Sequence, residues 1–121
     1  MTKSWDLQRI VAETGSTRTI LPTDHSTLFT NRGGGACTWT LPPIADVQAG
    51  WWVEFFVVAA GDQVITAPTD KIVLFNDATA TSLTVGTDGE EIGNRVHVEF
   101  DGTTYLGTVS LAKEAVTMTI A

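Results

Sequence analysis

Apolar and polar residues alternate with a period of two in several short segments of this chain. The clearest case is residues 95–101, where Val96, Val98 and Phe100 fall on one side and charged or polar residues on the other. Because successive side chains of a β-strand point to opposite faces of a sheet, this pattern predicts a strand with one buried face. Four further segments share the alternation: residues 37–41, 63–67, 81–85 and 116–120.

Turn-forming residues separate these segments at intervals typical of short strands. Gly, Pro, Asn and Asp recur roughly every 8–12 residues, a spacing that indicates a sandwich or barrel. Asp101-Gly102 predicts a hairpin turn, and the run Gly33 to Gly35 predicts another between residues 27–31 and 36–41. The length of 121 residues suits one domain. The expected fold is an all-β, single-domain antiparallel β-sandwich or barrel with an N-terminal arm.

The first residues of the chain do not follow the strand pattern. Leu7, Ile10 and Val11 have the i, i+3, i+4 spacing of one helix face. The same stretch can also form an extended arm. We therefore divide the chain into residues 1–13, an N-terminal arm or short helix, and residues 14–121, the β domain.

The segment over residues 51–59 is apolar on both faces and carries a single carboxylate. An antiparallel strand in a thin domain normally has one face in solvent, and this segment has no polar face. Either it lies at the centre of a two-sided core, or another subunit buries its second face. Because exposed apolar patches are uncommon on monomers, we favour a subunit interface, with Trp51, Trp52, Glu54 and Phe56 as the self-association residues. Glu54 then needs a partner, such as an arginine of the same or a neighbouring subunit.

Acidic residues outnumber basic residues, which limits the classes of partner. The chain has 14 Asp and Glu against 7 Lys and Arg, a formal net charge of −7. The basic residues are scattered singly, which argues against binding to nucleic acid or to an anionic membrane surface. With one cysteine, no disulfide within the chain is expected. The first residues lack the apolar run of a signal peptide, so we expect a soluble protein made in the cytoplasm.

Candidate catalytic residues are few. Residues 24–26 are Asp, His and Ser, the residue types of a hydrolytic triad. Neighbours in sequence cannot generally adopt the mutual geometry of a triad, so a polar turn is expected there. His97 lies on the polar side of its strand, where a solvated face or an ion pair between subunits is the favoured interpretation. Cys37 shares a strand face with apolar residues and is expected to be buried. We predict that the protein is not an enzyme.

The sequence also lacks metal-binding and cofactor-binding patterns. It has no CxxC, HExxH or EF-hand spacing. The carboxylates of Asp88, Glu90 and Glu91 are of the kind that binds Ca²⁺, but an acidic solvated loop is the favoured interpretation. We therefore expect neither a metal nor an organic cofactor.

Four local motifs follow one another along residues 14–110. They are Thr-Leu-Pro at the end of a strand (40–42), Gly50 before a hydrophobic strand, Gly-Asp-Gln followed by two apolar residues and Thr (61–66), and Asp-Gly-Thr-Thr-Tyr (101–105). In this order they resemble the β-rich virion domains of tailed bacteriophages. Such domains occur in head decoration (cement) proteins, head fibres and tail fibres.

The resemblance implies a structural virion protein that forms a homotrimer and has no catalytic function. A single domain without shaft repeats fits a capsid decoration protein better than a tail fibre, so the expected partner is the major capsid protein. The expected location is the capsid surface, with stabilisation of the shell as the function. Docking is assigned to the N-terminal arm, through Trp5, Leu7, Ile10 and Val11. The alternative is a receptor- or glycan-binding head or tail fibre module.

Overall fold

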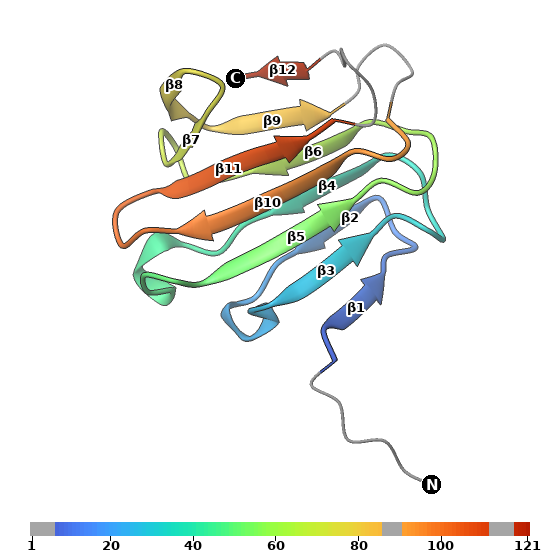
Figure 1. Ribbon diagram of the computed structural model, residues 1–121, viewed down its shortest axis with the longest axis horizontal. Coiled ribbons are helices and arrows are strands. Elements are labelled where there is room, and N and C mark those ends of the chain that lie inside the picture. Colours follow the sequence, from blue (N-terminus) through green and yellow to red (C-terminus); the bar gives the residue numbers. More distant parts are fainter. Residues whose placement is uncertain (1–6, 86–90, 112–117) are drawn as a thin grey trace, which may run out of the picture.

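The computed structural model describes residues 7–85, 91–111 and 118–121 of the chain. In these residues it contains β-strands and two short 3-10 helices, η1 (Pro22–Asp24) and η2 (Ile44–Asp46). The strands form two sheets that pack against each other (Figure 1). The prediction of an all-β sandwich is therefore confirmed.

The larger sheet has seven strands and the smaller sheet has five. In spatial order, the larger sheet consists of β1 (Arg9–Ala12), β3 (Thr27–Thr30), β5 (Trp52–Phe56), β10 (Arg95–Phe100), β11 (Tyr105–Ser110), β7 (Ile72–Leu74) and β8 (Asp77–Ala80). The smaller sheet consists of β12 (Met118–Ile120), β9 (Ser82–Val85), β6 (Gln63–Thr66), β4 (Cys37–Thr40) and β2 (Thr17–Thr19).

From β1 to β6 the chain crosses to the opposite sheet after every strand. Strands two apart in sequence therefore become neighbours and run in the same direction: β1, β3 and β5 in the larger sheet, and β2, β4 and β6 in the smaller one. The later strands β9, β10 and β11 add antiparallel pairs. The predicted antiparallel pairing thus holds for only part of the sandwich, because a strand that returns after visiting the other sheet runs parallel to its neighbour.

Of the two predicted hairpins, one is present. β10 and β11 pair in antiparallel fashion around Asp101 and Gly102. The Oδ1 atom of Asp101 accepts the N–H groups of Thr103 and Thr104, each at 2.8 Å, and Gly102 has a φ of +100°. The hairpin predicted around Gly33 to Gly35 is wrong. β3 and β4 lie in different sheets, and this turn carries the chain from one sheet to the other.

The N-terminal segment contains an edge strand where a helix was one of two expectations. Residues Arg9–Ala12 form β1, which pairs with β3. Val11 packs against the core, while the side chains of Ile10 and Leu7 are 63% and 75% exposed. Pairing with β3 gives this short segment backbone hydrogen bonds that an isolated helical turn forms only at high cost. The extended alternative is therefore the one observed, and Trp5 lies outside the described residues.

Aromatic side chains fill much of the core between the sheets. Phe29, Trp39 and Phe55, from three different strands, form a cluster with ring centroids 5.2 to 5.7 Å apart. The three apolar residues of β10 that were predicted to be buried all contribute to the core. Cys37 is buried and free, as predicted, and burial raises the pKa of its thiol to about 11. The thiol therefore stays protonated and unreactive at neutral pH.

Candidate functional site

The outward face of β5 and β10 carries the most organised set of partly exposed side chains on the larger sheet. In the antiparallel register, Trp52 lies opposite Glu99, Glu54 opposite His97, and Phe56 opposite Arg95. Paired residues of neighbouring strands point to the same side of a sheet. We call these six residues the β5–β10 face. Five of them are half-buried, and Glu99 is exposed.

Glu54 is the centre of the β5–β10 face. Its carboxylate accepts a hydrogen bond from Arg95 Nη1 at 2.8 Å and lies 3.1 Å from His97 Nδ1. The Glu54 side chain is only 17% exposed, so its charge needs such partners. Of the two alternatives for the partner of Glu54, an arginine of the same chain is therefore the one observed.

Two aromatic rings contact the two partners of Glu54. The Trp52 ring stacks on the His97 ring, with centroids 5.4 Å apart and planes inclined by 26°. The Arg95 guanidinium lies over the Phe56 ring, 5.5 Å from its centroid. Such contacts restrict the rotamers of long side chains before any partner arrives, which lowers the entropy lost on binding. The β5–β10 face is therefore preorganised.

The face extends sideways onto the neighbouring strands. The strands β1, β3, β5 and β10 lie side by side in the larger sheet (Figure 1). Their registers place Ile10, Leu28, Glu54 and His97 in one row across it. Ile10 was predicted to dock to a capsid and Glu54 to mediate self-association. The structure places these two residues on the same side of one sheet, with the buried residue Leu28 between them.

Trp51 does not belong to this face. Its side chain is 6% exposed, its Nε1 donates to the carbonyl oxygen of Pro22 at 2.9 Å, and its ring meets Tyr105 edge-on. The period of two along β5 explains the separation, because Trp51, Val53 and Phe55 point into the core. Of the four predicted self-association residues, Trp51 is therefore a core residue, and Trp52, Glu54 and Phe56 share the outer face.

The predicted docking residues are also divided. Val11 points toward the core, opposite Phe29, whereas Ile10 and Leu7 are exposed. The two exposed side chains lie at the open edge of the larger sheet. A partner can reach these two side chains directly.

The triad residue types at 24–26 serve the turn, as expected. Asp24 is buried, with Oδ1 bound to Arg9 Nη1 at 2.7 Å and Oδ2 accepting the Leu21 N–H at 2.8 Å. The Nδ1 atom of His25 accepts the N–H of Trp52 at 3.2 Å. Both carboxylate oxygens of Asp24 are thus bound to groups other than His25. The aspartate and the histidine act separately as structural groups.

Metal ligands do not gather in the described part of the chain, where no group of three or more His, Cys, Asp or Glu side chains is placed to hold an ion. Of the acidic residues considered for Ca²⁺, Asp88 and Glu90 lie outside the described residues, and Glu91 is buried. None of the helices among the described residues has the length and apolar character needed to span a bilayer.

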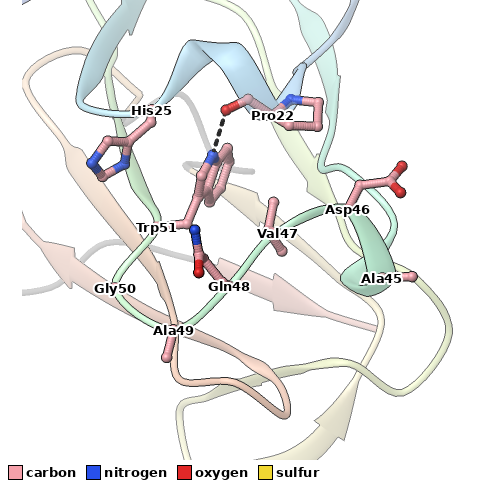
Figure 2. Close-up of a pocket in the computed structure, with 9 residues that line it drawn as sticks. All are labelled: Pro22, His25, Ala45, Asp46, Val47, Gln48, Ala49, Gly50 and Trp51. Carbon is pink, nitrogen blue, oxygen red and sulfur yellow. Dashed lines mark hydrogen bonds between the residues drawn. The ribbon is translucent and has the colours of Figure 1, made fainter.

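Two clefts lie on either side of η2, and sequence reasoning missed both. The first has a volume of about 520 Å³ and is lined by Pro22, His25 and residues 45–51 (Figure 2). The second has a volume of about 460 Å³ and is mainly apolar, with Leu41, Pro43 and Ile44 in its lining. Most of these residues belong to loops, whose side chains follow no periodic pattern that would have indicated a cleft.

The fold and these surfaces were compared with known proteins. No protein-family model, curated protein or solved structure matches the chain.

Proposed function

We propose that this chain is a structural protein of a tailed-bacteriophage virion that decorates the capsid. It self-associates as a homotrimer and binds the assembled shell through the major capsid protein. The observation that carries the proposal is the preorganised β5–β10 face, in which Trp52, Glu54 and Phe56 combine apolar area with fixed charges. The order of motifs along residues 14–110 supports the virion setting.

The residue types of the β5–β10 face are those expected at a self-association interface. Aromatic residues and arginine are enriched at the centres of protein interfaces and account for much of the binding energy. The face carries the carboxylates of Glu54 and Glu99 beside the guanidinium of Arg95. Neighbouring charges of both signs fix the orientation in which a second copy fits. The interface is therefore specific as well as apolar.

Docking to the shell uses the open edge of the larger sheet, where Leu7 and Ile10 are exposed. A protein that binds the assembled shell and not its separated subunits stabilises the shell by mass action. Three linked copies add avidity, because the second and third contacts form within one complex. Shell stabilisation thus needs no chemical reaction at any residue.

The oligomeric state tests the role of the β5–β10 face. We expect sedimentation equilibrium of the wild-type chain to give three chain masses. Phe56→Ala should weaken the assembly by about tenfold or more, the effect of truncating an interface aromatic. The matched control is Phe75→Ala, since Phe75 is 54% exposed and lies between β7 and β8, away from the face. A monomeric wild type, or equal effects of the two substitutions, would contradict the proposal.

Copy number in purified particles tests the capsid setting. Quantitative mass spectrometry of purified particles should find about one copy of this chain per subunit of the shell. A chain absent from particles, or present at a few copies per particle, is not a decoration protein. This measurement is independent of the oligomer measurement, so each part of the proposal can fail separately.

A further inference from the structure

Both ring nitrogens of His97 lie beside carboxylates. Nδ1 is 3.1 Å from Oε2 of Glu54, on the neighbouring strand β5, and Nε2 is 3.3 Å from Oε1 of Glu99, on β10 itself. A neutral imidazole has one N–H and donates to only one of these carboxylates, whereas the imidazolium donates to both. In the neutral ring, the second nitrogen directs its lone pair at an oxygen that is also an acceptor. Only the doubly protonated ring therefore satisfies both contacts.

The charges around His97 balance when this ring is protonated. Besides the two carboxylates, the cluster contains Arg95, whose Nη1 donates to Oε1 of Glu54 at 2.8 Å. With a neutral ring the cluster has one negative charge in excess, and with an imidazolium it has none. On the other side of β10, strand β11 places three residues beside the cluster, and none of them is titratable: Leu106, Thr108 and Ser110.

The charge of this cluster affects the cost of covering the β5–β10 face. An unbalanced charge loses more solvation free energy on burial than a cluster whose charges are paired. The surface that covers the face belongs to another copy of a chain with a formal net charge of −7. A negative excess on the face therefore also adds repulsion between like charges. Protonation of His97 removes both penalties.

Trp52 adds a contact that favours the charged ring. The indole stacks on the His97 imidazole, with ring centroids 5.4 Å apart. A cation over an aromatic face is attracted more strongly when water is excluded, as it is in an interface. In the separate chain the His97 side chain is 34% exposed, so water can deliver and remove the proton. The ring thus exchanges protons with solvent before assembly and is covered by it.

We propose that protonation of His97 strengthens self-association through the β5–β10 face, so that the assembly is tighter in mildly acidic than in mildly alkaline solution. Coupling between two bound species is reciprocal, so the second copy and the proton each favour binding of the other. Histidine side chains are the ones that commonly change charge between about pH 5 and 8. This regulation rests on the proposed self-association, because it acts through the same face.

Sedimentation at constant ionic strength tests the pH dependence. We expect the dissociation constant of the wild-type assembly to be lower at about pH 6 than at about pH 8 by about tenfold or more. His97→Gln keeps a polar side chain that cannot titrate, and its dissociation constant should change by less than about twofold over the same range. Circular dichroism at both pH values establishes that the variant is folded.

The matched control is His25→Gln, which removes the other of the two histidines of the chain. The His25 ring meets Trp52 edge-on, with centroids 6.0 Å apart, and makes no ion pair with Glu54 or Glu99. This variant should keep the pH dependence of the wild type. The α-amino group also titrates in this range, but it is present in both variants and so cannot distinguish them.

Ring-nitrogen chemical shifts of His97 provide a second readout in the unmodified chain. At a fixed pH of about 7, raising the protein concentration should move these shifts toward the doubly protonated form as the chains assemble. Shifts that do not change on assembly, an assembly equally tight at both pH values, or a pH dependence that persists in His97→Gln would overturn the regulation and leave self-association standing. A chain that is monomeric at both pH values would overturn the two together.

Discussion

Asn31 connects three segments of backbone through one side-chain amide. Its Nδ2 donates to the carbonyl oxygens of Gly35 and Ala59, and its Oδ1 accepts the N–H groups of Val58 and Ala59, at distances of 2.9 to 3.2 Å. Asn31 is buried, so these backbone groups have little access to water as a replacement partner. The side chain thus joins the end of β3 to the segment that follows β5.

Replacing this amide should therefore destabilise the fold. We expect Asn31→Ala to lower the free energy of unfolding by about 2–3 kcal/mol, since several polar groups lose their partner at once. Chemical denaturation followed by tryptophan fluorescence measures the change. Gln48→Ala is the control, because it removes an exposed amide without a hydrogen bond and should change stability by less than about 0.5 kcal/mol. Equal effects of the two substitutions would refute the role assigned to Asn31.

At single residues, the sequence predicted which side chains are buried better than it predicted which residues they contact. The alternation in β10 identified the core side of that strand, and Cys37 was correctly expected to be buried. Trp51 was grouped with Trp52, although the period of two places these neighbours on opposite faces. A run that is apolar on both faces contains no signal for which face meets the second sheet. Which face is buried depends on the strands that pair with β5, and a local sequence pattern does not identify them.

At the scale of elements, the crossovers between sheets require backbone positions that admit no side chain. Gly61 lies in the connection between β5 and β6, with a φ of +134°. A Cβ atom at this position would lie 2.3 Å from the backbone nitrogen of Ala36 and 2.7 Å from the carbonyl carbon of Gly35. Two crossovers, from β3 to β4 and from β5 to β6, thus pack backbone against backbone.

Gly61→Ala should disrupt this contact. We expect a loss of about 3 kcal/mol or more in the free energy of unfolding, because both strain at a positive φ and a collision with backbone atoms result. Gly50→Ala separates the two causes: Gly50 also has a positive φ, of +96°, but no atom within 4 Å of an added Cβ. Its cost should be only about 1–2 kcal/mol. Similar losses in both variants, measured by denaturation, would show that the close contact is unimportant.

The elements themselves were more predictable than their connections. Alternation and turn residues located β4, β6, β9 and β10, because those signals are local. They carry no information on whether the next strand stays in the same sheet. The stretch Gly33 to Gly35 permits a hairpin and a crossover equally well, and the crossover is found. The parallel pairs follow from that choice, and the loop residues of the cleft gave no periodic signal at all.

At the scale of the whole molecule, two carboxyl groups link stability to pH. The hydrogen bond from Arg18 lowers the pKa of Glu13, and the N–H groups of Thr104 and Thr103 lower the pKa of Asp101. Both groups therefore bind protons more weakly in the folded than in the unfolded chain. Their stabilisation is complete above the unfolded pKa of about 4 and is lost as the pH falls through the lower folded pKa.

The midpoint of thermal unfolding, Tm, should accordingly fall when the pH is lowered below about 4. The double variant Glu13→Gln/Asp101→Asn cannot titrate at these positions and should have a lower Tm at pH 7 but a shallower acid decline. Circular dichroism melts between about pH 7 and pH 2 measure both profiles. Parallel profiles for the variant and the wild type would assign the acid decline to other groups.

The alternation of the first six strands between sheets also determines the order in which the protein can be completed on the ribosome. β5 finds one neighbour, β3, early, but its second neighbour, β10, emerges only after about forty further residues, and β6 likewise waits for β9. During that interval the edge of β5, with its aromatic side chains, lacks a covering strand, and such bare edges promote aggregation. The late strands therefore complete the sheets during nascent-chain folding, and β5, the strand that carries the proposed interface, is left with an unpaired edge until β10 has been synthesised.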